Sequence, residues 1–311
     1  MIDCQNLTKR YGPLLAVDDL SFQVRPGEVL GFLGPNGAGK STTMRIIAGF
    51  LPATSGRASV CGFDVETEGT EAKRRIGYLP EGAPSYPEMS PRSFLEFVAD
   101  VRGMTGEHRQ RRLDEVFGLL HLEPVLEQTI DTLSKGYKRR VGLAQAILHD
   151  PEVLILDEPT DGLDPNQKHE VRQLINQMSE RKIIVISTHL LEEVDALCNR
   201  AIIIAHGKIL ADDTPEKLEA RSRFNNAVSL KLVDASRIAE AREGIESLSE
   251  VESVEIDEHS DRLTAFPANG QLPLTAITEL ASSRNWELSE LHLESGRLDE
   301  VFRTITGGAA A

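Results

Sequence analysis

A glycine-rich stretch between a strand pattern and a helix pattern constrains this chain more than any other feature. It reads Gly34-Pro-Asn-Gly-Ala-Gly-Lys-Ser-Thr42, follows the apolar run Val29 to Leu33 and precedes the helical apolar positions Met44, Ile46 and Ile47. Glycines at this spacing let backbone N–H groups turn inward around phosphate oxygens, and the helix that follows adds its positive end. The sequence therefore predicts a phosphate-binding loop (P-loop) in an α/β domain.

The polar residues of this loop have separate predicted roles. Lys40 would reach the β- and γ-phosphates of a nucleotide and act in catalysis, and the Ser41 hydroxyl would bind Mg²⁺. We expect the whole loop to contact the nucleotide, namely Gly34, Pro35, Asn36, Gly37, Ala38, Gly39, Lys40, Ser41 and Thr42.

A second apolar run ends in two carboxylates. Val153 to Leu156 predicts a buried strand, and Asp157 and Glu158 follow it directly. After a P-loop, the first carboxylate is placed to bind Mg²⁺ directly or to hold one of its ligands, and the second to orient and deprotonate an attacking water. Asp157 is therefore a predicted metal ligand and Glu158 a predicted catalytic base.

The patterns of strands and helices divide the chain into two predicted domains. Residues 1–222 alternate short β-branched runs with helical patterns, which is typical of an α/β domain with a mostly parallel sheet. Within it, apolar residues at helical spacing predict a helical subdomain over about 82–150. Residues 223–311 predict a smaller accessory domain.

This second domain has an α+β pattern. Alternating apolar residues indicate strands at 228–232, 254–256, 263–265 and 286–293, with helical stripes at 238–248 and 274–281. The order βαββαβ is that of a ferredoxin-like unit, and a short helix follows from about 296 to 306. A change of phase near Ser289 predicts a bulge in the last strand.

The balance of charge limits the partners of the chain. It has 49 Asp and Glu against 34 Lys and Arg, a net charge of −15, and such a field repels nucleic acid. No apolar run approaches the roughly 18 residues that a membrane helix needs. We therefore expect no nucleic-acid partner and no membrane-spanning helix in this chain.

Further motifs occur in a fixed order over residues 1 to about 215. Leu133-Ser-Lys-Gly-Tyr137 resembles the signature motif of the ATP-binding cassette (ABC) family. Asp161 to Asp164 is similar to the D-loop of that family, Ser187-Thr-His189 to its switch histidine, and Ile76 to Glu81 to its Q-loop. Tyr11 occupies the adenine-stacking position. Together with the P-loop and the carboxylate pair, these motifs identify the chain as similar to ABC ATPases.

The resemblance implies an ATPase that works in pairs. In this family two cassettes meet head to tail, and each ATP lies between the P-loop of one and the signature of the other. Ser134 and Gly136, at a helix N-terminus, would then contact the ATP bound by a second copy of the chain. His189 would contact the γ-phosphate and stabilise developing charge, and Tyr11 and Asp164 would contact the nucleotide.

A membrane partner is also implied by the resemblance. The motifs resemble those of cassette subunits of the exporter class, whose membrane subunit is a separate six-helix polypeptide. The chain would then lie at the cytoplasmic face of the membrane and dock through residues 82–105. There Tyr86 and Met89 are the interface candidates, whereas Phe94 and Phe97, at helical spacing, are expected in the core of the lobe.

Two motifs depart from the family pattern. Glu81 stands where the Q-loop usually has Gln, and either serves as an oxygen ligand near Mg²⁺ or brings a negative charge to the coupling surface. Lys135 and Tyr137 replace the usual Gly and Gln, and Lys135 either faces the opposing nucleotide or points into solvent. The predicted Mg²⁺ ligands are thus Ser41, Asp157 and Glu81.

Two other functions stay open on the sequence. A soluble cassette ATPase acting on ribosomes or DNA usually fuses two cassettes in one chain and carries basic surfaces. A binding module that merely switches with nucleotide would not need Glu158 and His189. The sequence favours the ATPase of an exporter, and it identifies neither the cargo nor the role of residues 223–311.

Overall fold

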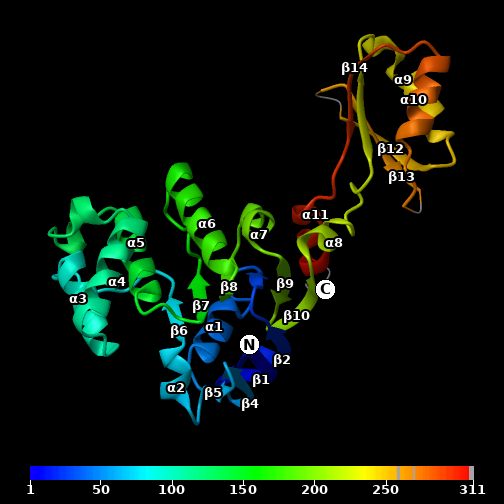
Figure 1. Ribbon diagram of the computed structural model, residues 1–311. Coiled ribbons are helices and arrows are strands. Elements are labelled where there is room, and N and C mark those ends of the chain that lie inside the picture. Colours follow the sequence, from blue (N-terminus) through cyan, green and yellow to red (C-terminus); the bar gives the residue numbers. More distant parts are fainter. Residues whose placement is uncertain (258–259, 269, 308–311) are drawn as a thin grey trace. The chain divides into compact units, whose positions relative to one another are not determined.

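The chain divides after Thr214 into two separately folded units, Met1–Thr214 and Pro215–Ala311 (Figure 1). The computed structural model describes residues 1–257, 260–268 and 270–307. Within these ranges no helix combines the length and the apolar composition of a membrane span.

A six-stranded sheet forms the centre of the first unit, in the order β10-β9-β3-β8-β7-β6. Its strands are β3 (Val29–Leu33), β6 (Ile76–Leu79), β7 (Val153–Asp157), β8 (Ile183–Thr188), β9 (Arg200–Ala205) and β10 (Lys208–Asp213). Strands β9, β3, β8, β7 and β6 run parallel to one another, and β10 pairs antiparallel with β9. Every residue of β3, β6, β7 and β8 is buried, which explains their continuous apolar runs. The predicted parallel sheet is confirmed.

A second, antiparallel sheet lies in the same unit, in the order β2-β1-β4-β5. It consists of β1 (Ile2–Tyr11), β2 (Leu14–Val24), β4 (Ser55–Val60) and β5 (Phe63–Asp64). The sequence did not predict this sheet, because the apolar pattern of a strand does not tell which other strands it pairs with.

Helices complete the first unit. Around the sheets lie α1 (Lys40–Ile47), α2 (Gly69–Arg74), α6 (Pro165–Ser179) and α7 (Leu191–Leu197). The helical lobe contains α3 (Pro91–Val101), α4 (Gly106–Leu119), two 3₁₀ turns (Glu123–Val125 and Ile130–Thr132) and α5 (Lys135–Ile147). Figure 1 shows α3, α4 and α5 grouped beside the sheet.

The apolar face of α3 corrects one expectation about this lobe. Ser90 caps the helix by accepting a hydrogen bond from the Ser93 amide, with Pro91 at the first helical position. Phe94 is buried as expected, but Phe97 is 44% exposed. The prediction that Phe97 lies in the core is wrong, because it falls at the edge of the stripe on which Phe94 and Val98 are buried.

The second unit contains a four-stranded antiparallel sheet in the order β12-β13-β11-β14. Its elements are α8 (Pro215–Glu219), β11 (Val228–Leu232), a 3₁₀ turn (Ala235–Arg237), α9 (Ile238–Glu246), β12 (Val251–Asp257), β13 (Arg262–Pro267), α10 (Leu274–Ser283), β14 (Leu288–Leu293) and α11 (Leu298–Gly307). The predicted ferredoxin-like order is confirmed. Lys231 pairs with Glu290 and Leu232 with Leu288, so Ser289 is the extra residue of the predicted bulge.

Candidate active site

Loops that carry the predicted site residues meet at one edge of the six-stranded sheet. Since β3, β8, β7 and β6 run parallel, their carboxyl ends lie together, with Leu33 paired to Thr188 and Asp157 to Ser187. From this edge β3 enters the P-loop, β6 leads to Glu81, and β7 and β8 lead to the predicted catalytic side chains. Ligands of open parallel sheets bind at such an edge.

The P-loop closes tightly around its own lysine. Gly37 and Gly39 have φ of 80° and 107°, a region that favours glycine, and α1 begins directly afterwards at Lys40. Lys40 is buried, and its Nζ donates hydrogen bonds to the carbonyls of Gly34 at 2.6 Å and Pro35 at 3.2 Å. Burial lowers the pKa of Lys40, while nearby carboxylates oppose this effect. The ammonium group therefore lies inside the loop predicted to surround phosphates.

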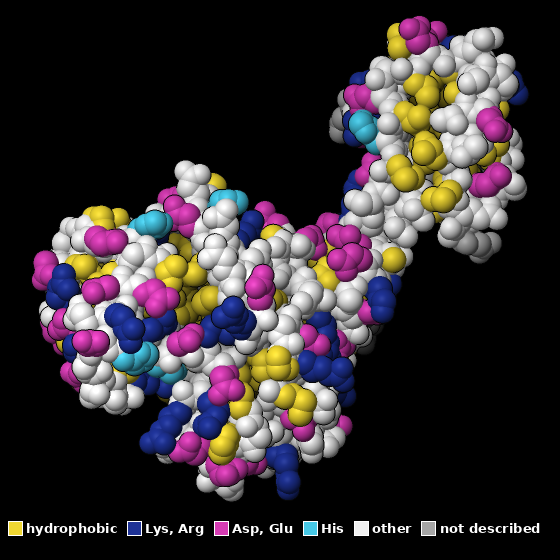
Figure 2. Space-filling view, in the orientation of Figure 1, with side chains coloured by type: hydrophobic (Ala, Val, Ile, Leu, Met, Phe, Trp, Pro, Cys, Tyr) yellow, Lys and Arg dark blue, Asp and Glu magenta, His cyan; other side chains and the backbone are white. Residues whose placement is uncertain are grey.

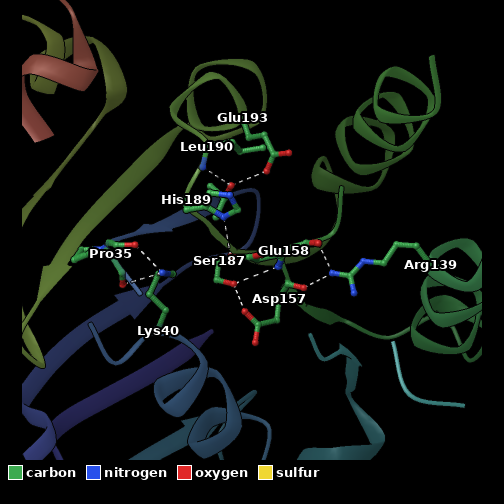
Figure 3. Close-up of polar contacts among 11 residues, drawn as sticks. Pro35, Lys40, Arg139, Asp157, Glu158, Ser187, His189, Leu190 and Glu193 are labelled. Carbon is green, nitrogen blue, oxygen red and sulfur yellow. Dashed lines mark hydrogen bonds and ion pairs between the residues drawn. The ribbon is translucent and has the colours of Figure 1, made fainter. Parts of the chain in front are cut away.

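Asp157 is held by the neighbouring strand. It is 1% exposed, and Ser187 Oγ donates a hydrogen bond to its Oδ1 (Figure 3). Its Oδ2 is buried and has no hydrogen-bond partner among the described residues. An unpaired buried carboxylate oxygen is costly, and it is a donor atom that suits a hard cation or a water bound to one. The sequence motif contained Ser187, but only the cross-strand pairing reveals its contact with Asp157.

Glu158 and His189, on neighbouring loops, form a pair. Nδ1 of His189 lies 2.9 Å from Oε1 of Glu158, so the predicted base and the predicted switch histidine contact each other directly. This contact leaves Nε2 of His189 to interact with a substrate oxygen. The backbone N–H of Glu158 donates to the Ser187 carbonyl at 3.0 Å, which anchors the turn that carries the carboxylate.

A buried carboxyl group supports the turn of His189. Glu193 is 1% exposed and accepts a hydrogen bond from Thr188 Oγ1 at 2.8 Å. That hydroxyl in turn accepts from the Leu190 amide at 3.0 Å, so both residues flanking His189 are held (Figure 3). The sequence did not single out Glu193, since an acid at the start of a helix usually faces solvent.

Other predicted nucleotide contacts lie in a second group. Ser134 caps α5 by accepting from the Tyr137 amide, and Asp164 caps α6 by accepting from the Gln167 amide at 2.9 Å. The two helix starts adjoin each other, because a Cβ built on Gly136 would lie 2.4 Å from Oε1 of Gln167. The structure thus brings Ser134, Gly136 and Asp164 together with one another.

Three further residues named by the sequence have different surroundings. Tyr11 is 44% exposed at the end of β1, with Lys9 Nζ 5.3 Å from the centre of its ring. Glu81 is exposed in the loop after β6. The stem of Lys135 packs along the D-loop, since its Cδ would lie 3.4 Å from a Cβ built on Gly162.

Comparisons with known proteins identify the family. A family model described as ABC transporter matches residues 17–161. The linearmycin resistance ATP-binding protein LnrL of Bacillus subtilis (strain 168) is 34% identical over 309 residues, which cover 99% of this chain and 98% of LnrL. The chain belongs to the family of ABC transporter ATP-binding proteins. The Nod factor export ATP-binding protein I of Burkholderia pseudomallei (strain 1710b) is 38% identical over 70% of this chain and 72% of its own length.

Solved ABC cassettes share the fold. An ATP-binding subunit of an ABC transporter superimposes with a TM-score of 0.67 at 29% identity, over 71% of this chain and 92% of that one. A dimeric cassette in a post-hydrolysis state with ADP and Pi gives 0.65 at 25% identity, over 69% of this chain and 99% of that one. The predictions of an ABC cassette that binds and hydrolyses ATP are confirmed, whereas the roles of single residues stay predictions.

The buried Glu193 carboxyl predicts how stability changes with pH. Burial raises the pKa of Glu193 above its ordinary value of 4.5, although the hydrogen bond from Thr188 opposes the shift. The folded chain therefore holds this proton more tightly than the unfolded chain. The resulting stabilisation is fully present below pH 4.5 and is lost as the pH rises through the raised pKa.

Glu193→Gln removes this titration and keeps an acceptor for Thr188. We expect the free energy of unfolding of Glu193→Gln, relative to that of the natural chain, to increase as the pH rises from 4.5 through the raised pKa of Glu193. Urea denaturation of both proteins across that range measures the difference. A difference that stays constant with pH would contradict the assignment.

Proposed function

We propose that this cassette is the ATPase subunit of an exporter, in which two copies close head to tail around two ATP molecules and drive a separate membrane subunit. The observation that carries the proposal is the gathering of Lys40, Asp157, Glu158 and His189 at one edge of the sheet (Figure 3). In this arrangement Lys40 binds phosphate oxygens, Glu158 accepts a proton from the attacking water, and His189 stabilises charge on the γ-phosphate.

Mg²⁺ fits the donor atoms at this edge. The buried, unpaired Oδ2 of Asp157 supports a role for this residue in binding the ion, with the Ser41 hydroxyl and Glu81 as further candidates. Across the described ranges no three or more His, Cys, Asp or Glu side chains are grouped so that they could hold a metal. This agrees with the usual coordination of Mg²⁺ in nucleotide sites, where one or two carboxylates and the substrate phosphates are its ligands. Bound there, Mg²⁺ would neutralise negative charge on the phosphates.

A second copy of the chain would complete each site. Ser134 is exposed at the start of α5, and Gly136 is buried in the first turn of this helix, whose N-terminus is positive and suits a phosphate. Asp164 lies beside them at the start of α6, and the aliphatic stem of Lys135 packs along the D-loop. We infer that this second group faces the ATP bound by the partner copy. The dimeric state of the similar solved cassette supports this arrangement.

Names of relatives support export as the process. LnrL is named for linearmycin resistance and the Burkholderia protein for Nod factor export. The match to LnrL extends over 99% of this chain and so includes the ferredoxin-like unit. We propose an ATP-binding domain over 1–222, with a helical subdomain over about 82–150, and an accessory domain of the same subunit over 223–311; this boundary lies eight residues beyond the division of the structure after Thr214. The whole subunit would lie at the cytoplasmic face of the membrane.

The helical lobe offers a docking surface for the membrane subunit. A cavity of about 790 Å³ opens between the lobe and β6, and is lined by Phe50, Ile76, Tyr78, Phe97, Val98 and Val101, among others. Phe50 is 65% exposed, Phe97 44% and Val101 70%. The ring centre of Tyr86 lies 5.7 Å from that of Phe97, so Tyr86 adjoins the cavity. Exposed apolar groups in such a patch indicate an interface, and we assign it to an apolar cytoplasmic segment of the membrane subunit.

The alternative of a ribosome- or DNA-bound ATPase has less support. Acidic and basic side chains are interspersed over the face of the molecule in Figure 2. The chain as a whole carries a net charge of −15. Proteins that bind nucleic acid need local excess positive charge to displace counterions from the phosphates.

Glu158→Gln tests the hydrolytic role of the carboxylate. We expect its kcat for ATP hydrolysis to fall by a factor of about 10² to 10⁴, because the amide cannot accept the proton from water. The KM for ATP should change little, since the P-loop is intact. Phosphate release by the purified chain gives both constants. Glu180→Gln, an exposed substitution at the end of α6, is the control, and equal kcat in both variants would refute the assignment.

Phe97→Asp tests the membrane partner. We expect affinity purification of the tagged chain from detergent-solubilised membranes of its native cell to recover a polytopic protein in equal amount. Phe97→Asp should lose this protein and keep ATP hydrolysis, because the charge lies in the apolar patch and not at the phosphate site. Leu119→Asp, at a residue of the same lobe that is similarly exposed (41% against 44%), should keep it. Recovery of ribosomal or DNA-bound proteins alone would favour the alternative.

A further inference from the structure

Arg139 joins three parts of the cassette through one buried guanidinium group. The residue lies in α5 and is 6% exposed. It donates hydrogen bonds to the carbonyls of Asp157 and Glu158 (Figure 3). It also donates to the carbonyl of Pro159 at 3.3 Å and to that of Pro80 at 3.2 Å. Three successive carbonyls, beginning with that of the last residue of β7, and the carbonyl before Glu81 thus converge on a side chain of the signature helix.

These contacts bear on the backbone that carries the predicted base. The backbone of Glu158 has φ of 52°, a left-handed conformation that costs free energy for every residue type except glycine. Such a conformation persists where the surrounding contacts hold it. The guanidinium supplies part of that support, since it binds the carbonyls before, at and after Glu158.

We propose that Arg139 is a positioning residue that ties the signature helix to the catalytic carboxylate of the same chain. The proposal rests on the proposed function, in which Ser134 of this helix contacts the ATP of the partner copy while Glu158 acts on the ATP of its own copy. A shift of α5 toward the partner's ATP then moves the guanidinium and with it the carbonyls around Glu158. Arg139 thereby links the two ATP sites of a dimer.

The shape of the arginine side chain explains why an arginine is needed to bind these carbonyls. The planar guanidinium carries five N–H donors in a fixed fork and can bind carbonyls from two loops at once. A lysine ammonium is a compact point charge on a flexible stem and cannot span the same acceptors. The charge alone is therefore expected to be insufficient.

Arg139→Gln and Arg139→Lys test the link. We expect both variants to lower kcat for ATP hydrolysis by about tenfold to a hundredfold, because a displaced base acts at the wrong distance. The KM for ATP should stay within about twofold, since Lys40 and the P-loop are untouched. Arg112→Gln is the matched control. Arg112, in α4, also donates hydrogen bonds to backbone carbonyls of another segment, those of Ile147 and Leu148 at the end of α5, and these lie outside the Glu158 turn.

Hydrogen exchange reports on the same contact without catalysis. The Asp161 amide donates to the Glu158 carbonyl, which Arg139 also binds. We expect faster amide exchange over residues 157–164 in both Arg139 variants and unchanged exchange there in Arg112→Gln. If Arg139→Gln fails to fold, Arg139→Lys, which keeps the charge, provides the comparison.

The two measurements separate this proposal from the function on which it rests. Normal kcat in Arg139→Lys, or equal losses in the Arg139 and Arg112 variants, would overturn the positioning role. Unchanged exchange over 157–164 would do the same. If the natural chain proves to hydrolyse ATP without a partner copy, the proposed dimer fails, while faster exchange and lower kcat in the Arg139 variants would still establish the contact with the Glu158 turn.

Discussion

Parallel pairing of β3, β8, β7 and β6 is the constraint on which the rest of the structure depends. The pairing brings the P-loop, the carboxylate pair and the histidine to one edge, although they lie far apart in the sequence. Because these strands are buried on both faces, their residues are apolar until the last positions, where Asp157, Ser187 and Thr188 appear. Polar chemistry is thus confined to the end of an apolar sheet.

Buried polar groups behind this edge hold the predicted site residues. Ser187 orients Asp157, Glu193 supports the turn of His189 through Thr188, and Arg139 binds the backbone around Glu158. Burying such groups is costly unless each finds hydrogen-bond partners, so they add little net stability. Their contribution is to geometry, because each restricts a predicted site residue or its backbone to a narrow range of positions.

Local patterns in the sequence predicted much of the fold and the site. The P-loop, the strand before Asp157, the ferredoxin-like order and even the bulge at Ser289 follow from residues that are neighbours in the chain. Interactions set by distant pairing could not be predicted: the antiparallel sheet of β1, β2, β4 and β5, and the contact of Ser187 with Asp157. Phe97 was misplaced because spacing alone does not define the edge of an apolar stripe.

The contacts of Ser134, Gly136 and Asp164 with nucleotide likewise cannot be derived from one chain alone. Within the chain Ser134 and Asp164 cap the starts of α5 and α6, and the predicted role of all three residues depends on a second copy. This makes ATP-dependent pairing the central claim of the account. Light scattering of Glu158→Gln, which should bind ATP without consuming it, measures that pairing directly. The account predicts a molar mass that doubles when ATP and Mg²⁺ are added, and a smaller change when Ser134→Ala is added to the same chain; a monomer under every condition would contradict it.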